Sequence, residues 1–364
     1  MSTQATDPPE RPAAAVSDSA TAHLVARLAA SRALVARLAS SDDPVVAYKA
    51  RSLVLGLAED TPEARALRAR IAGSPRARAL LAHRTADGTI PTNPYKKWQG
   101  PHWALYSLAQ LDYPPGDDSL RPLRDQVLGW LLSREHLRPP RTLLIAGQED
   151  RVRRCGSQEG NAIWYALRLG LEDERIGQLV DRLVRWQWPD GGWNCDKRPA
   201  ASTSSFQETA IPLRALWAFG HRHRHAPALA AAGRAAELLL ARRLLWRRGS
   251  GALLRPDWGG AVDRIAYPIQ FYDVLFALQA MAELGRIADP RCADALALLA
   301  GKQLPDGGFP LEERNAVTSS ALVTRGSHAD WGPVGRRTSN PLVSLLALGV
   351  LRAAREAVGA GLEA

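Results

Sequence analysis

Apolar residues recur at helical spacing along most of this chain, and no segment shows the alternation that is typical of a strand. Leu24, Leu28 and Leu38 lie on one stripe of the first helical segment. Two more helices are predicted at 45–57 and 62–82. The first follows Pro44 and the second begins at Pro62, and proline suits a first helical turn. The hydrophobic pattern therefore predicts a protein that is built from helices.

Two kinds of helix alternate from residue 87 onward. One kind is nearly uncharged beyond its first turn, which predicts burial on all sides, and is expected at 99–112, 158–170, 207–220, 269–285 and 340–354. The other kind carries charge on one face, as a solvated helix does, and is expected at 119–133, 173–187, 227–247 and 289–302. This alternation predicts an inner ring of helices inside an outer ring.

A repeated turn punctuates these helices. The segment 186–196, WQWPDGGWNCD, recurs at 301–311 as GKQLPDGGFPL. Proline ends the preceding helix, the paired glycines permit positive φ, and the aromatic residue that follows, Trp193 or Phe309, anchors the turn by packing. The second copy runs into a long insertion, 311–338, which is expected to be a lid, a binding loop or disordered.

The starts of the inner helices are polar. Each inner helix contains a small residue, alanine or serine, that is followed by leucine. Aligning these five pairs puts the helices in a common register. In this register, two successive aligned positions at the helix starts hold mostly polar residues. These are Gln99, Gln158 and Gln207 at the first position, and Glu159, Glu208, Gln270 and Asn340 at the second. We therefore expect these groups to gather around a common hollow.

The composition is that of one large folded domain. The chain has 364 residues, 46% of them hydrophobic, which suffices for a large core. The shared turns favour a single domain at 21–360, and the polar segment 1–20 is expected to be a disordered tail. The formal net charge is +10, but the basic residues are scattered along helices, so that no nucleic-acid partner is expected. The positive charge is compatible with a pocket for a small-molecule substrate that is apolar or anionic.

The cysteines and the hydropathy bear on the compartment. Three cysteines without a CxxC pair indicate a reducing environment, and hence a cytoplasmic protein. The polar N-terminus resembles no secretory signal, and no apolar run approaches about 18 residues, so that no transmembrane segment is expected. Cys155 is expected to be a half-buried thiol, with ligand or catalytic work alongside Cys195 as the alternative.

The PDGG turns, preceded by Gln187 and Gln303, resemble the repeats of the terpenoid cyclase and protein prenyltransferase superfamily, which includes squalene cyclase-like proteins. The resemblance covers about 44–354 and implies an all-α fold, a single α/α toroid of about five or six helical hairpins around a central cavity. It does not extend to the chemical motifs of that superfamily. The acidic DxDD motif is absent, and Cys195 is adjacent to Asp196 where the prenyltransferase zinc site has an Asp-x-Cys pair. Neither a metal nor a cofactor is therefore expected.

Four carboxylates are candidate catalytic residues. Glu159 and Glu208 would lie about 5 to 9 Å apart if neighbouring helices pack at the usual distance, which suits acid and base roles. The alternative is that both glutamates only complement helix dipoles. Asp273 stands in an apolar inner helix, so that it is either a site residue or paired with an arginine. Asp196 follows Cys195 and is expected to shape the pocket.

Candidate substrate-binding residues combine aromatic rings and amides at or near the inner-helix starts: Trp98, His102, Gln158, Asn161, Gln207, Tyr267, Gln270, Tyr272 and Asn340. Aromatic faces in a cavity would hold an apolar chain and stabilise carbocations, or they would stack on sugar rings. The alternative is that many of these rings belong to the ordinary core.

Three functions follow from these features. The resemblance favours an enzyme that acts on an isoprenoid or another apolar small molecule in a central cavity, by acid–base or carbocation chemistry. Paired glutamates with tryptophan platforms also fit a toroid polysaccharide lyase or glycosidase. The third hypothesis is a non-catalytic binding or scaffold protein, in which hydrogen bonds among the helix starts leave no cavity.

Overall fold

The computed structural model describes residues 18–137, 144–145, 148–152, 155–196, 198, 201–247, 250–254 and 261–362. Helices make up 56% of the structure and strands 4%, which confirms the predicted all-α class. The α-helices are α1 (Asp18–Ala30), α2 (Arg32–Ala39), α3 (Pro44–Lys49), α4 (Pro62–Ala72), α5 (Pro75–Leu81), α6 (Pro101–Gln110), α7 (Arg121–Leu131), α8 (Arg134–Leu137), α9 (Gly156–Leu169), α10 (Glu174–Trp186), α11 (Phe206–His223), α12 (Ala226–Leu240), α13 (Val274–Glu283), α14 (Ala293–Ala300) and α15 (Pro341–Leu362).

Short elements complete the described chain. A π-helical turn, η1 (Ala50–Val54), extends α3, and the 3₁₀ turns η2 (Asp118–Leu120) and η4 (Pro290–Cys292) lead into α7 and α14. Each of three small sheets has two strands: β1 (Leu144–Ile145) pairs antiparallel with β2 (Gln148–Val152), while β3 (Ala266–Tyr267) pairs parallel with β4 (Glu313–Arg314), and β5 (Val317–Thr318) with β6 (Gly326–Ser327).

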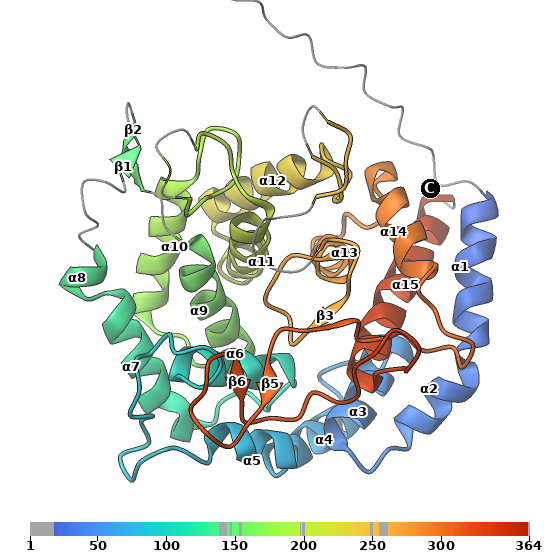
Figure 1. Cartoon of the computed structure of the whole chain (residues 1–364), viewed down its shortest axis with the longest axis horizontal. Coiled ribbons are helices and arrows are strands. Elements are labelled where there is room, and N and C mark those ends of the chain that lie inside the picture. The colour runs from blue at the N-terminus through green and yellow to red at the C-terminus, as the bar shows by residue number, and fades with distance from the viewer. Residues whose placement is uncertain are drawn as a thin grey trace, which may run out of the picture.

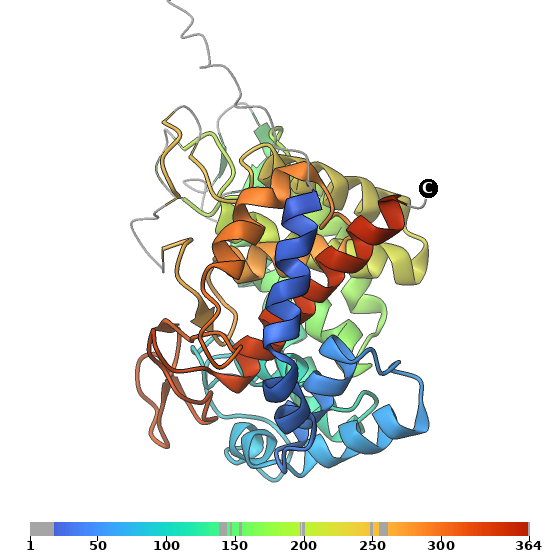
Figure 2. The same ribbon diagram turned by 90° about the vertical axis from the view of Figure 1, so that its right-hand side faces the viewer.

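The helices predicted as inner and outer pack in sequence order. Helix α6 contacts α9, α9 contacts α11, α11 contacts α13, and α13 contacts α15. Each of the first four also packs against the helix that follows it, which is α7, α10, α12 or α14 respectively. Helix α1 lies along α15, so that the two ends of the described chain are side by side (Figures 1 and 2).

Several predicted boundaries differ from the structure. The helices expected at 227–247 and 340–354 end at Leu240 and Leu362. Helix α1 begins at Asp18, so that residues 18–20 of the predicted tail are helical, while residues 1–17 lie outside the described part of the chain. The segment 62–82 forms α4 and α5, because Ser74 caps a new helix. The helix that we expected from residue 269 begins at Val274, where the Asp273 carboxylate accepts a backbone N–H of the first turn.

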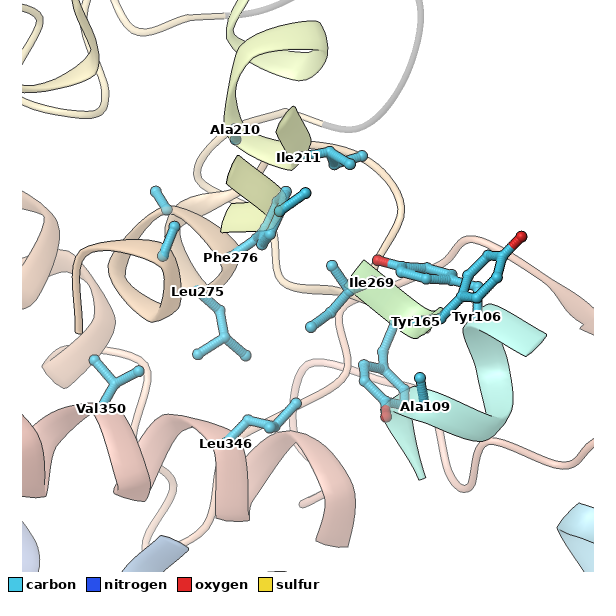
Figure 3. Close-up of a cluster of buried hydrophobic side chains, with 14 of the residues drawn as sticks. Tyr106, Ala109, Tyr165, Ala210, Ile211, Ile269, Leu275, Phe276, Leu346 and Val350 are labelled. Carbon is cyan, nitrogen blue, oxygen red and sulfur yellow. The ribbon is translucent and has the colours of Figure 1, made fainter. Parts of the chain in front are cut away.

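Apolar side chains fill the region where the inner helices face one another. Figure 3 shows a cluster of buried side chains from these helices and the adjoining loop, among them Tyr106, Tyr165, Ile211, Ile269, Phe276 and Leu346. None of these six is more than 5% exposed. The centre of the helix assembly is thus part of one continuous hydrophobic core.

Helices α9 and α11 approach each other closely. A Cβ atom at Gly160 would stand 2.9 Å from the backbone nitrogen of Pro212, and one at Gly156 would contact both Pro212 and Trp193 at 3.3 Å. Glycine at these positions therefore allows the two backbones to come together. As a result, the N-terminal end of α9 lies beside the N-terminal end of α11.

The first PDGG turn ties the end of α10 to the start of α11. The hydroxyl of Ser204 donates to Asp190 Oδ1 at 2.5 Å, and the backbone N–H of Trp193 donates to Thr209 Oγ1 at 3.3 Å. The indole N–H of Trp193 also donates to the carbonyl of Leu183 in α10, at 3.0 Å. The motif thus acts as a hydrogen-bonded clamp between an outer helix and the next inner helix.

The second PDGG turn repeats this clamp at α15. The hydroxyl of Ser339 donates to Asp306 Oδ1 at 2.6 Å, and the N–H of Phe309 donates to Ser344 Oγ at 2.8 Å. The sequence separation of aspartate and serine is 14 residues in the first copy and 33 in the second. The insertion 311–338 is therefore accommodated between two fixed anchor points.

This insertion packs over the start of α6. The indole N–H of Trp98 donates to the carbonyl of Asn315 at 3.0 Å, and Gln99 Nε2 donates to that of Ala321 at 2.6 Å. Trp331 is buried, with 3% of its surface exposed. The insertion is therefore a folded cover on one end of α6.

Candidate functional site

A cleft of about 1350 Å³ opens at the N-terminal end of α11. Described residues of the loop 189–205, helix α12 and residues 241–247 form its sides, and residues 271–272 reach it from the segment before α13. Its aromatic lining consists of Phe206, Trp246, Phe271 and Tyr272. The cleft therefore lies at the starts of α11 and α13, beside the core and not at its centre.

Charged side chains of both signs line this cleft. Four arginines line it, Arg198, Arg234, Arg242 and Arg247, together with Asp190, Asp196 and Glu237. Asp196 forms an ion pair with Arg198 at 2.6 Å, and Arg234 Nε donates to Gln187 Oε1 at 2.9 Å. A mainly apolar wall with cationic groups around it suits a molecule that has both an apolar part and an anionic part.

Cys155, Cys195 and Glu208 meet at the inner side of this cleft. One donor atom from each lies within 4.8 Å of the other two. The Sγ of Cys195 donates to Glu208 Oε1 at 3.7 Å. Cys195 lines the cleft directly, as does Gln207, the neighbour of Glu208. Two thiols and one carboxylate are a donor set that suits a thiophilic divalent metal.

Local structure explains how these three donors come together. Cys155 is the residue before α9, and Glu208 lies in the first turn of α11, which Ser205 caps. The backbone N–H of Ser157 donates to Glu208 Oε2 at 2.9 Å, so that the starts of the two helices share the carboxylate. Cys195 follows the first PDGG turn, whose clamp holds it over the start of α11.

Burial and hydrogen bonding shift the pKa values in this cluster. Burial raises the pKa of the Glu208 carboxyl, although the hydrogen bond from Ser157 opposes the shift. The hydrogen bond with Cys195 and burial together raise the pKa of the Cys155 thiol. Burial lowers the pKa of Lys97, whereas the nearby Cys155 and Glu208 act in the opposite direction. Lys97 therefore interacts electrostatically with this cluster.

Glu159 is directed away from the cleft. Its Oε1 accepts a hydrogen bond from Arg182 Nη1 of α10 at 2.9 Å and lies 3.4 Å from His136 Nε2 of α8. Burial opposes ionisation of Glu159, but His136 and Arg182 together hold its pKa below the usual value. Glu159 and Glu208 influence each other electrostatically, yet the two carboxyls bind different partners.

The two candidate aspartates also have defined partners. Asp273 caps α13, with Oδ1 accepting the N–H of Phe276 and Oδ2 that of Ala266, both at 2.8 Å. Its expected position within a helix was wrong, and backbone N–H groups take the place of the arginine that we considered. Burial raises the pKa of Asp273 to about 7, against the effect of these hydrogen bonds. Asp196 lines the cleft.

The predicted amides have diverse positions. Gln207 donates through Nε2 to the carbonyl of Gln270 at 2.7 Å, so that the structure brings these two residues together beside the cleft. Asn340 Oδ1 accepts a backbone N–H of α15 at 3.1 Å, while its Nδ2 donates to two carbonyls of the insertion. Gln158 is half-buried at the start of α9, and Asn161 is buried in the same helix.

Of the aromatic candidates, Tyr272 lines the cleft, and its hydroxyl donates to a backbone carbonyl at 2.9 Å. Trp98 lies under the insertion, as described above. Tyr267 is buried with its ring 5.4 Å from that of Trp331, and it borders a second pocket, of about 210 Å³. The predicted aromatic residues therefore do not form one surface.

His102 lies in an aromatic environment. Its ring centroid is 5.1 Å from that of Tyr95, 5.3 Å from that of Trp103 and 5.5 Å from that of Tyr165. Burial and the charge of Lys97 lower its pKa to about 3, so that the ring is neutral near pH 7. Within the described residues, neither ring nitrogen has a hydrogen-bond partner.

Comparison with known proteins gives no identification. No family model matches the sequence, and no curated protein matches it. Of the helices in the described part of the chain, none combines the length and the apolar character needed to cross a membrane. The site itself is therefore the basis for a functional proposal.

Sequence reasoning did not predict the cluster of donors or the place of Lys97 beside it. The expectation of no metal rested on the absence of known motifs, but the structure brings together three donors from three segments. The usable signal was the pair Cys155 and Cys195, of which the first directly precedes a polar helix start and the second follows the PDGG turn that leads to another. Glu208 was predicted as a site residue, but not as their neighbour.

Proposed function

We propose that the helices form an α/α toroid of the terpenoid cyclase and protein prenyltransferase type, and that the chain is an enzyme acting on an amphipathic small molecule. Its substrate would be an isoprenoid or a similar apolar molecule with an anionic group, bound in the cleft at the start of α11. The observation that carries the proposal is the lining of this cleft, in which Phe206, Phe271 and Tyr272 stand among Arg234 and Arg242.

The order of helix contacts supports the toroid. Inner helices contact one another in sequence order, and each of α6, α9, α11 and α13 packs against the helix that follows it. A toroid of helical hairpins requires this pattern of neighbours. The two PDGG clamps also join outer to inner helices in the same way at two places.

The geometry favours this function over a lyase or glycosidase with paired glutamates. Glu159 is engaged by Arg182 of α10, whereas Glu208 lies beside Cys195 and Gln207 of the cleft lining. Acid–base or carbocation chemistry in the cleft would therefore involve Glu208 or Asp196, which is one of three carboxylates in the lining. The aromatic faces of Phe271 and Tyr272 would stabilise developing positive charge.

Ligand binding tests the proposal. Calorimetry would compare farnesyl diphosphate with farnesol and with inorganic diphosphate, and we expect the whole molecule to bind at least about tenfold more tightly than either part. Arg242→Gln should weaken diphosphate binding, and Phe271→Ala should weaken farnesol binding. Arg185→Gln, which removes an exposed arginine of α10, is the matched control and should leave both unchanged.

Two results would contradict the proposal. One is that the folded protein binds none of the three probes. The other is that Arg242→Gln and Phe271→Ala bind them as well as Arg185→Gln does. Conversion of the bound diphosphate to a new product, detected by mass spectrometry, would distinguish an enzyme from a binding protein.

A further inference from the structure

Two cysteines and a glutamate from three segments converge at the edge of the cleft. Cys155 is the residue before α9, Cys195 follows the first PDGG turn, and Glu208 belongs to α11. All three donor atoms lie within 4.8 Å of one another. We propose that Cys155, Cys195 and Glu208 bind a zinc ion.

The spacing of the donors suits a tetrahedral ion. With zinc–sulfur bonds near 2.3 Å and zinc–oxygen bonds near 2.1 Å, neighbouring ligand atoms of a tetrahedral site are about 3.5 to 3.8 Å apart. The Sγ of Cys195 and the Oε1 of Glu208 are already 3.7 Å apart. All three separations are at most 4.8 Å, so that shifts of about 1 Å or less complete the triangle.

The protein framework holds the three ligands in place before metal arrives. Glu208 cannot turn away freely, because Ser157 N–H donates to its second oxygen at 2.9 Å. The close packing of Gly160 against Pro212 fixes the start of α9 relative to α11. The outer hydrogen bond to the carboxylate is the kind of support that orients metal ligands and increases affinity.

The electrostatic surroundings favour an anionic metal complex. Two thiolates and one carboxylate around Zn²⁺ carry a net charge of −1. The N-terminal ends of α9 and α11 both face the cluster and supply positive dipole ends. Lys97 is a further basic group that interacts with Cys155, Cys195 and Glu208. These features compensate the negative charge without a fourth protein ligand.

Three protein ligands leave one position of a tetrahedral zinc site open. Structural zinc sites are closed by four ligands, whereas catalytic sites keep a position for water or substrate. Cys195 lines the cleft, so that this position is accessible from it. We therefore assign the metal a role at the substrate, where it would bind the anionic group or a water molecule. On binding, each thiol releases its proton to solvent and donates a sulfur electron pair to the ion.

Metal titration without any substrate tests this assignment. The reduced, chelator-treated chain would be titrated with Co²⁺ alone, and we expect one equivalent to produce the thiolate-to-cobalt charge-transfer band and the visible bands of a tetrahedral complex. Zn²⁺ should displace the cobalt and remove these bands. X-ray absorption of the zinc form should show two sulfur and two oxygen or nitrogen neighbours.

Variants assign the ligands individually. Cys155→Ser and Cys195→Ser should each weaken zinc binding by about 100-fold or more, and Glu208→Gln by about tenfold or more. Cys292→Ser is the matched control, since this buried thiol donates to the carbonyl of Arg286 near α14 and should not affect binding. Circular dichroism of each variant would establish that it is folded.

Two outcomes would overturn the assignment. One is that the reduced chain binds no Co²⁺ or Zn²⁺, which needs no variant to establish. The other is that binding persists at full affinity in Cys155→Ser and Cys195→Ser. Because no prenyl probe is present in these titrations, their failure is distinguishable from failure of the proposed function. If the protein binds zinc in these titrations but binds none of the prenyl probes in the calorimetry, the metal site stands and the isoprenoid proposal is removed.

Discussion

Glu159 Oε1 accepts a hydrogen bond from Arg182 Nη1 at 2.9 Å, in an ion pair whose side chains are 0% and 4% exposed. The same guanidinium donates to the carbonyl of Leu131 at 3.0 Å. The pair therefore joins α9, α10 and the end of α7 in a region that is closed to solvent. This connection explains why Glu159, although predicted as catalytic, has a structural environment.

Breaking this pair on one side should destabilise the protein strongly. Arg182→Met leaves a buried carboxylate without its cation, and we expect a loss of about 3 to 5 kcal/mol in the free energy of unfolding. Adding Glu159→Met to that variant removes the unpaired charge and should restore roughly half of the loss. Urea unfolding of the wild type, both single variants and the double variant measures the coupling. Strictly additive losses would show that the two residues do not act as a pair.

The glycines of the PDGG clamps should be essential for their geometry. Gly191 has φ of +101°, and a Cβ there would lie 2.8 Å from the carbonyl oxygen of Arg234. Gly307 has φ of +83°, with the carbonyl oxygen of Ala30 at 2.6 Å. Replacement of either glycine by alanine should cost at least about 2 kcal/mol of unfolding free energy, from strain and steric overlap.

Gly177 provides the control for this prediction. It lies within α10, and a Cβ at its position meets no neighbouring atom within 4 Å. Gly177→Ala should therefore stabilise the protein by about 0.5 to 1 kcal/mol, through the higher helix propensity of alanine. Denaturant unfolding of the three variants gives the comparison. Equal effects at Gly177 and Gly191 would argue against a special role for the repeated turn.

The helices were predictable from sequence because their signals are local. Hydrophobic periodicity located α6, α9, α10 and α11 within a few residues, and the repeated motif located both clamps. Local signals failed at 269–285, where a capping aspartate looked like a residue within an apolar helix. The boundary depended on tertiary hydrogen bonds that periodicity does not record.

The site was less predictable, since it depends on directions around helices as well as on levels along them. Aligning the inner helices placed Glu159 and Glu208 at one level. That register does not specify how each helix is rotated, and consecutive residues on a helix differ by about 100° in direction. Glu159 consequently points to α10, and Glu208 to the start of α9. Cys155 and Cys195 meet because α9 and α11 pack closely and because the PDGG clamp holds Cys195 over the start of α11.

Asp273 should make the protein less stable as the pH rises. Burial raises its pKa to about 7 in the folded state, against about 3.9 in an unfolded chain. The folded protein therefore retains a proton that the unfolded chain has lost, and this stabilising contribution is full below about pH 4 and disappears as the pH rises through 7. Asp273→Asn cannot ionise, so that its stability relative to wild type should improve by about 2 to 4 kcal/mol from pH 4 to pH 8. Unfolding curves at several pH values measure this difference, and a constant difference across the range would contradict the prediction.

His102 should make the protein less stable as the pH falls, through much of the same pH range. Its pKa is lowered to about 3 in the folded state, mainly by burial, while an unfolded histidine titrates near about 6.5. The unfolded chain therefore gains a proton that the folded protein does not, so that stability is full above about pH 6.5 and is lost as the pH falls toward 3. At pH 5 this loss is about 2 kcal/mol.

His102→Leu removes the group, and its stability relative to wild type should therefore rise by that amount between pH 8 and pH 5. His221→Leu, at an exposed position near the end of α11, should show no such change. If His102→Leu follows the wild type at every pH, the ring at position 102 is accessible to protons in the folded protein, and its aromatic environment does not exclude the charged form.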